Sequence, residues 1–421
     1  MNLSRLFSAD ALLSLLLHCL KALAALFVNW LVLRHFAVDD FLVWSVTSSI
    51  LVVATASDLG IGQYTVTKLI NSDRRDWAVR VSESLGALVP LALASGLFVF
   101  FALGEVSTLY KGTMAALLAA RMVTIPFAAV LNAVNQFKIR KAIELAAYCV
   151  AALGIGAVVL ADADVRLALV VLNATFLLGA TLTVMAAAHY VSLGSSLKVA
   201  SAARSVHVFR RAVPFMANNL SGLMTYGGFV WLSSLVLPPA EAAKLAVLHS
   251  FVLINLYQLY DVFLKARQAE LADPAHWALY RRLNLLFMLA VPPLFALGGR
   301  EALALIGNPV AISLPEAALF GLFMTFEMGN LFAQSITQVN HGLVNRLNAY
   351  SAIRSAMLGG FIVAGLLPAA GDDRLLLLLA LLSFGSMTAF VYLLRGLKLN
   401  GADDDNQPGG LDAVRLFAVK K

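Results

Sequence analysis

Two cationic side chains stand in the middle of long apolar stretches, where a charge is costly. Lys21 lies within Ala11–Leu33, and Arg121 lies within Gly112–Val134. A cation at the centre of a bilayer costs roughly 2.5–3.5 kcal/mol on insertion scales, so such a residue rarely faces lipid. Lys binds phosphate as a point charge, and Arg binds it through forked hydrogen bonds. The two residues therefore indicate a polar interior that handles an anion.

Polar side chains accompany these charges along predicted helical faces. His18 and Lys21 are three positions apart and share one face, and Asn29 lies close to the same stripe. Comparable polar positions recur in apolar stretches of the second half of the chain. Stripes from both halves predict one central, water-accessible cavity, lined by His18, Asn29, Asn218, Asn219, Tyr226, Asn255, Gln258 and Asn330.

Substrate binding in this cavity is assigned to three cations, Lys21, Arg121 and Arg354. An intramembrane charge is by default a functional-site hypothesis. A structural alternative stays open, in which Lys21 or Arg121 pairs with a carboxylate such as Glu327 or Glu144 and holds helices together. Arg354 lies near the predicted inner end of its stretch, where a long side chain also reaches the interface.

Three further titratable residues are candidates for coupling an ion to transport: Glu327, Asp58 and His249. Each has an alternative role. Asp58 stands near the predicted inner end of its stretch, where an interfacial structural role is favoured. A single His within an apolar stretch is also typical of an interhelical hydrogen bond.

The composition is that of a membrane protein with many helices. Of 421 residues, 60% are hydrophobic and 13% are charged, whereas a soluble domain has about a quarter charged residues. The apolar residues fall in runs long enough to cross roughly 30 Å of hydrocarbon as helices. Cys19 and Cys149 both lie inside such runs and are interpreted as small core residues.

Motifs of enzymes and metal sites are missing from the sequence. It contains no Gly-rich phosphate loop followed by Lys and Ser or Thr, no His-Glu-x-x-His and no Gly-x-Ser-x-Gly, and no Cys/His spacing typical of a metal site. We therefore expect a protein that is not an enzyme and uses no cofactor or metal.

The hydrophobic pattern predicts an all-α, polytopic fold of about twelve transmembrane helices in two six-helix lobes. Residues 1–190 form the first lobe, 191–211 a cytoplasmic linker, 212–396 the second lobe and 397–421 a cytoplasmic tail. The predicted spans are 11–33, 40–62, 81–103, 112–134, 143–161, 166–188, 213–236, 243–264, 284–306, 312–336, 348–368 and 374–394.

The distribution of Lys and Arg predicts which way the chain lies in the membrane. Most of them fall in the termini and in the even-numbered loops, for example Arg74, Arg75, Arg140 and Lys141. Because cytoplasmic loops carry the excess of Lys and Arg, both termini are expected in the cytoplasm. The net charge of +7 is therefore interpreted as a topology signal and not as a nucleic-acid patch.

Several short motifs resemble those of a known family. Leu31–Phe36 and Asp39–Trp44 lead into the second span, Asp58–Gln63 closes it, and Arg211–Phe215 precedes the seventh span. These segments are similar to those of polysaccharide-transporter flippases, the Wzx-like O-antigen and exopolysaccharide group of the multidrug/oligosaccharidyl-lipid/polysaccharide exporter superfamily. Val43 departs from that pattern, in which Gly is usual.

The resemblance implies a fold, an activity and partners. It implies two six-helix lobes in a V shape that alternate between inward-open and outward-open states in the bacterial inner membrane. It also implies a cationic cavity that moves an undecaprenyl-pyrophosphate-linked oligosaccharide to the periplasmic face. A polysaccharide polymerase and chain-length proteins would be further partners besides the lipid bilayer.

Other classes of membrane protein stay open. A major-facilitator-like transporter of a soluble anion is one, although the loop Lys68–Asp76 has Asp-Arg without the flanking Gly pattern of that group. A multidrug exporter of the same superfamily would be expected to carry carboxylates in its cavity. A non-transporting membrane subunit of a polysaccharide assembly is the third alternative.

Overall fold

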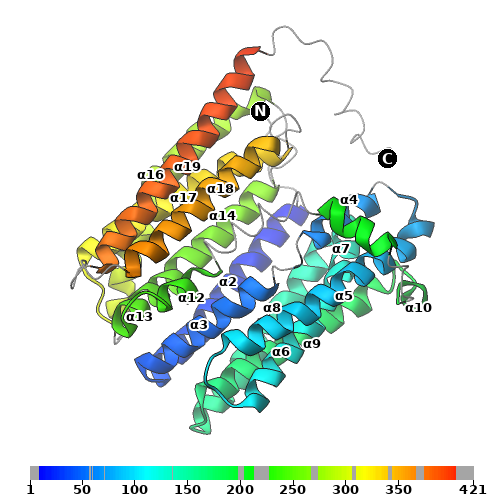
Figure 1. Ribbon diagram of the computed structural model, residues 1–421, viewed down its shortest axis with the longest axis horizontal. Coiled ribbons are helices and arrows are strands. Elements are labelled where there is room, and N and C mark those ends of the chain that lie inside the picture. Colours follow the sequence, from blue (N-terminus) through cyan, green and yellow to red (C-terminus); the bar gives the residue numbers. More distant parts are fainter. Residues whose placement is uncertain are drawn as a thin grey trace.

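The protein is a bundle of long helices that lie roughly side by side (Figure 1). The structure, a computed structural model, describes residues 9–403 apart from 56–57, 59, 71, 135, 198–202, 213–226, 267–273, 306–309, 340–343 and 367–373. In the described residues all regular elements are helical, so the predicted all-α fold is confirmed. The N-terminal end of α2 (Ala9–His35) and the C-terminal end of α19 (Arg374–Asp403) lie on one side, here named the terminal face.

The helices of the first half follow α2 in chain order. They are α3 (Val38–Thr55), α4 (Ile61–Ile70), a short 3₁₀ turn η2 (Arg74–Asp76), α5 (Trp77–Ala102), α6 (Thr108–Val123), α7 (Ile125–Ala133), α8 (Phe137–Leu160), α9 (Val165–Ala187) and α10 (Leu193–Ser196). A further helical segment covers residues 203–212. Its Val208 and Ala212 are buried against Ile61 and Leu88, so part of the predicted linker packs on α4 and α5.

The helices of the second half precede α19. They are α12 (Phe229–Ser234), α13 (Pro239–Leu248), the π-helical turn η3 (His249–Leu253), α14 (Ile254–Ala266), α16 (Pro274–Leu305), α17 (Leu314–Val339) and α18 (Val344–Leu366). Pro292 and Pro293 lie inside a continuous α16. The last helix continues nine residues beyond the predicted span end at 394, while the remainder of the predicted tail lies outside the described residues.

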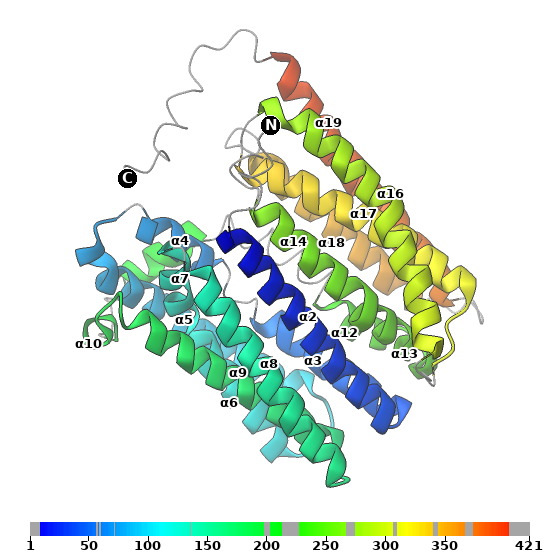
Figure 2. The same cartoon turned by 180° about the vertical axis from the view of Figure 1, so that it is seen from behind.

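Two views place the elements in three groups (Figures 1 and 2). Helices α4–α9 form one flank and α16–α19 form the other. Between them lie α2, α3 and α12–α14, and the halves meet where α3 packs on α12 and α13 and where α2 packs on α14. A large apolar core joins these central helices to both flanks.

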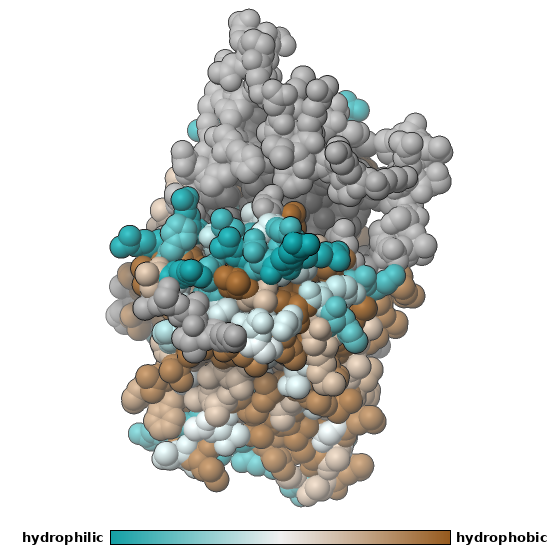
Figure 3. Space-filling model, turned by 90° about the vertical axis from the view of Figure 1, so that its right-hand side faces the viewer, coloured by the Kyte–Doolittle hydropathy of each residue, from teal (hydrophilic) through white to brown (hydrophobic). Residues whose placement is uncertain are grey.

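Eight of the described helical stretches are long and apolar enough to cross a membrane. Large apolar side chains on them face outward, such as Leu97, Phe101 and Leu153, which are 60%, 75% and 76% exposed. On the face shown in Figure 3, a hydrophilic band crosses the middle and the surface below it is mainly hydrophobic. The chain is therefore a multi-pass membrane protein. The eight stretches are Val38–Thr55, Arg74–Ala102, Thr108–Ala133, Lys138–Leu160, Val165–Ala187, Pro239–Tyr257, Arg282–Ala304 and Arg374–Arg395.

Two of the predicted continuous spans are interrupted. The span predicted over 40–62 ends as α3 at Thr55, and α4 begins only at Ile61 after a turn in which Gly60 has a φ of +78°. The span predicted over 112–134 breaks between α6 and α7, where Pro126 stands in the first turn of α7. The two second pieces, α4 and α7, pack on each other.

Candidate functional site

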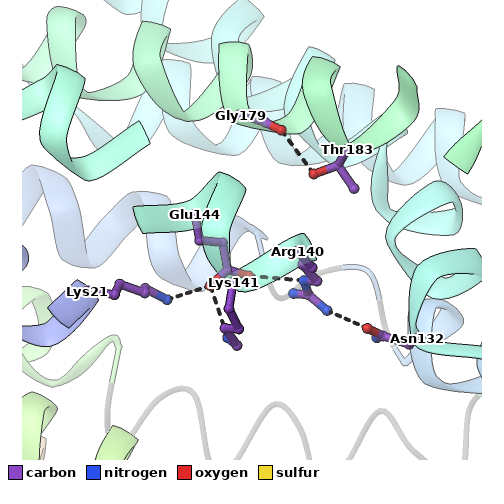
Figure 4. A network of polar contacts seen from close by, with 7 residues as sticks. All are labelled: Lys21, Asn132, Arg140, Lys141, Glu144, Gly179 and Thr183. Carbon is purple, nitrogen blue, oxygen red and sulfur yellow. Dashed lines mark hydrogen bonds and ion pairs between the residues drawn. The ribbon is translucent and has the colours of Figure 1, made fainter. Parts of the chain in front are cut away.

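Three cations meet one carboxylate between α2 and α8 (Figure 4). Glu144 accepts hydrogen bonds from Lys21 Nζ at 2.8 Å, from Lys141 Nζ at 3.0 Å and from Arg140 Nε at 3.0 Å. Arg140 also donates to Asn132 Oδ1 at 3.3 Å. We name Lys21, Arg140, Lys141 and Glu144 the basic cluster.

The local fold explains how the cluster forms. Residues three and four positions apart face the same side of a helix, so Arg140, Lys141 and Glu144 converge in the first turns of α8. Lys21 comes from α2, which packs along α8. Lys21 lies twelve residues after the start of α2, or about 18 Å along that helix at 1.5 Å per residue.

The basic cluster carries more positive than negative charge, and its side chains are partly exposed. Three cations and one carboxylate give a formal charge of +2. The side chains of Lys21, Arg140 and Lys141 are 15%, 34% and 19% exposed, and that of Glu144 is 24% exposed. Because three cations share the single carboxylate of Glu144, these cations keep N–H donors that a second anion can accept.

Arg121 joins the basic cluster through two aromatic rings. Its guanidinium lies 5.0 Å from the ring centre of Phe176, and Phe176 meets Tyr148 edge-on at 5.0 Å. Lys21 Nζ lies 5.8 Å from the ring centre of Tyr148. Among the described residues, the guanidinium of Arg121 makes no hydrogen bond or ion pair. Two of the three predicted cations are thus linked through these rings, and Lys21 pairs with Glu144, as in the structural alternative that the sequence left open.

Arg354 lies in a different environment in the second half. Its Nη2 donates to Glu327 Oε2 at 2.6 Å and its Nη1 to the Tyr350 hydroxyl at 2.7 Å. Arg354 and Glu327 are 1% and 0% exposed, so water does not reach this pair. Ser386 and Asn330 donate to the other Glu327 oxygen. Asn330 and Arg354, both predicted to line the cavity, are part of this closed network.

The two halves carry opposite charge at corresponding places. Ser107 and Ser313 cap α6 and α17, and each hydroxyl accepts the backbone N–H three residues on. Arg121 lies thirteen residues after the first residue of α6, and Glu327 lies thirteen residues after the first residue of α17. The same helical position is therefore cationic in the first half and anionic in the second.

The remaining described candidates have structural contacts. The Asp58 carboxylate accepts the backbone N–H groups of Gly60 and Gly62, at 3.0 and 3.2 Å, where α4 begins. Asn29 accepts a hydrogen bond from the indole of Trp44 at 3.1 Å.

His249 and Asn255 border the π-helical turn. His249 is buried and begins the turn. The amide of Asn255 donates to carbonyls of that turn, which a π-turn leaves without their usual partners.

Other predicted positions lie outside the described part. Asn218, Asn219 and Tyr226 belong to the segment 213–226, which the structure does not describe. His18 and Gln258 lie on α2 and α14, but their side chains are not described. Their assignment to the cavity stays a prediction.

Sequence reasoning missed part of the basic cluster. Arg140 and Lys141 were interpreted as topology signals, and Glu144 was named only as an alternative partner of a buried cation. The signal that could have found them is the spacing Arg140, Lys141, Glu144 at the start of an apolar helix.

A pocket of about 330 Å³ lies on the side opposite the terminal face. It is lined by the turns after α2 and α8, including Asp40, Asp162 and Asp164. Its residues are distinct from the basic cluster, and its acidic lining suits a cation better than an anion.

Comparison with known proteins gives the fold. No family model and no curated protein matches the sequence. Among solved structures, the chain is similar to the eukaryotic MATE transporter AtDTX14, at 16% identity and a TM-score of 0.64, covering 92% of this chain and 95% of that one. The inward-facing conformation of a multidrug resistance MATE family transporter of the MOP superfamily matches at 14% identity and a TM-score of 0.65, covering 94% and 99%.

A third similar structure is that of a MOP superfamily transporter from Pyrococcus furiosus. It matches at 12% identity and a TM-score of 0.54, covering 94% of this chain and 99% of that one. Reverse polarity of its binding pocket was taken to suggest a different function for that protein. This chain therefore has the fold of these MATE transporters.

Proposed function

We propose that this protein is a flippase that moves an undecaprenyl-pyrophosphate-linked oligosaccharide, such as an O-antigen, capsule or exopolysaccharide repeat unit, from the cytoplasmic to the periplasmic face by alternating access. The observation that carries the proposal is the basic cluster with Arg121. It consists of four cations and one carboxylate on helices of the bundle, and the side chains of Lys21, Arg140 and Lys141 are partly exposed.

Charge decides which cargo fits. A phosphate-bearing headgroup brings strong acceptor oxygens and negative charge, and Arg and Lys supply matching donors. An exporter of cationic drugs would need acceptors at this place instead. The polyprenyl tail would stay in lipid, and the Asn, Gln and Tyr positions predicted from the sequence would bind the sugars.

The fold supports transport but leaves the cargo open. The matched structures include multidrug resistance transporters, and one MOP superfamily transporter whose pocket polarity is reversed. The reversed polarity in that transporter supports the view that, in this fold, the charge of the binding pocket differs between proteins of different function. We place the termini in the cytoplasm on the Lys and Arg distribution, and a polysaccharide polymerase and chain-length proteins remain proposed partners.

We propose two kinds of role for the predicted site residues. Lys21 and Arg121 are proposed to bind the anionic group, together with Arg140 and Lys141. Arg354 is better suited to supporting the second half, because its guanidinium is enclosed with Glu327. Of the three ion-coupling candidates, Glu327 and Asp58 have engaged carboxylates, and His249 lies buried at a π-turn.

The test is translocation of a pyrophosphate-linked lipid oligosaccharide in proteoliposomes that contain the purified chain alone. Lys21→Ala and Arg121→Ala should abolish translocation while protein abundance stays near normal. Lys244→Ala is the matched control, because Lys244 pairs with Glu316 at 2.8 Å in the other half, away from the cluster. Transport of free pyrophosphate without the lipid substrate would favour a soluble-anion transporter, and no transport without a partner would favour an assembly subunit.

A further inference from the structure

Glu144 holds the cations of the basic cluster in place in this structure. Its two carboxylate oxygens accept from three side chains, two on its own helix and one on α2. Arg140 and Lys141 would stay near Glu144 through helix geometry alone, since they lie four and three residues before it. Lys21 differs, because its ion pair joins two elements, α2 and α8.

The carboxylate occupies the place that a phosphate oxygen would take. Carboxylate and phosphate oxygens both accept strong charge-assisted hydrogen bonds from Lys and Arg, typically at about 2.7–2.9 Å. A pyrophosphate that links a lipid to a sugar carries one negative charge on each phosphorus. The formal surplus of +2 in the basic cluster matches that charge.

We propose that Glu144 is an internal counter-anion that the anionic group of the substrate displaces from Lys21. The proposal rests on the proposed function, in which this cluster binds the substrate headgroup. In the empty protein, Glu144 prevents three neighbouring cations from repelling one another. When the substrate arrives, Lys21 exchanges the Glu144 oxygen for a phosphate oxygen, and the carboxylate stays with Arg140 and Lys141.

The exchange connects binding to movement. Helix α2 packs on α8 in the first half and on α14 in the second. Releasing Lys21 from Glu144 removes an ion pair between α2 and α8, and the substrate takes its place as the link. A ligand shifts a conformational equilibrium only through such a difference in contacts between states.

The experiment measures binding of inorganic pyrophosphate to the purified full chain in detergent, by calorimetry and by thermal stability. Glu144→Gln removes the competing charge, so it should bind pyrophosphate about tenfold more tightly than the unaltered chain. Without pyrophosphate the variant should melt at a lower temperature, since its three cations repel, and pyrophosphate should raise its melting temperature more than that of the unaltered chain.

Two further variants make the result decisive. Glu144→Asp keeps the charge but shortens its reach toward α2, so its affinity should lie between those of the other two proteins. Glu316→Gln breaks the Lys244 pair in the other half and should leave pyrophosphate affinity unchanged. If Glu144→Gln and Glu144→Asp bind pyrophosphate no more tightly than the unaltered chain, the counter-anion role is overturned, whatever the lipid assay shows. Absence of binding in every variant would overturn both this role and the proposed function, and binding without lipid translocation would overturn the function alone.

Discussion

At the scale of residues, two ion pairs between helices differ in their access to water. Lys21 and Glu144 are partly exposed, and the Glu144 carboxylate also pairs with two more cations. Arg354 and Glu327 are enclosed, and the hydroxyls of Tyr350 and Ser386 and the amide of Asn330 also bond to them. A balanced, enclosed pair fixes helices, whereas an exposed cluster with surplus charge can take up a ligand.

Breaking the enclosed pair of Arg354 and Glu327 should lower the stability of the protein. Glu327→Leu leaves Arg354 buried without its anion, and losing one partner of a buried pair costs roughly 3–5 kcal/mol. Thermal unfolding in detergent should show this loss. The double variant Glu327→Leu with Arg354→Met should recover much of it, because neither charge is then buried alone. A double variant as unstable as the single one would contradict a role for the pair in stability.

The role of Arg121 can be separated into charge and shape. Arg121→Lys keeps the charge but loses the planar group that stacks on Phe176 and the forked donors that match phosphate. We expect reduced translocation for Arg121→Lys and none for Arg121→Ala, measured in proteoliposomes at equal protein content. Full activity of Arg121→Lys would show that charge alone is required.

Part of this site could be predicted from the sequence. Lys21 and Arg121 were found because an isolated cation inside an apolar stretch is conspicuous. Glu144 was one of two carboxylates considered as a partner, but the sequence could not decide between them, because Lys21 and Glu144 are 123 positions apart and meet only through the packing of α2 on α8. The ion pair between Arg354 and Glu327 could not be predicted for the same reason.

At the scale of elements, the breaks in two spans show what hydropathy does not report. Apolar composition continues through 40–62 and 112–134, so both stretches were predicted as single helices. The chain nevertheless breaks where Gly60 adopts a left-handed conformation and before Pro126. Asp58 then caps α4, which explains an acidic residue within a predicted span without invoking ion coupling.

Gly62 is required where the broken helices meet. A Cβ atom at this position would lie 2.9 Å from Ile125 Cγ2 and 3.0 Å from Asp58 Oδ2. Gly62→Ala should therefore lower stability by about 1–3 kcal/mol, the usual cost of overpacking. Melting in detergent measures the loss, and adding Ile125→Ala should reverse part of it.

A second glycine provides the control for this prediction. Gly156 lies within α8, and no atom stands within 4 Å of a Cβ built there. Gly156→Ala should be neutral or stabilising by roughly 0.5–1 kcal/mol, because Ala favours the helix. If Gly62→Ala behaves like Gly156→Ala, then α4 and α7 do not depend on close approach.

At the scale of the whole molecule, the halves meet through α3 and the helices α12 and α13. The Ser49 hydroxyl donates to the carbonyl of Gly227 and accepts the backbone N–H of Trp231. The rings of Phe41 in α3 and Phe251 in η3 lie 6.4 Å apart. The alternating access that we propose for this protein requires contacts of this kind to separate.

A cross-link across this contact tests that requirement. In a chain with Cys19→Ser and Cys149→Ser, the pair Phe41→Cys and Phe251→Cys would be joined by a short, cleavable bismaleimide. We expect the joined protein to bind pyrophosphate but to lose lipid translocation, because α3 can no longer leave the second half. Cleaving the reagent should restore transport, and each single cysteine variant treated alike should transport throughout. Translocation at the normal rate by the joined protein would mean that these helices stay together during the transport cycle. The two halves would then have to separate at another contact, and the packing of α2 on α14 is the next place to cross-link.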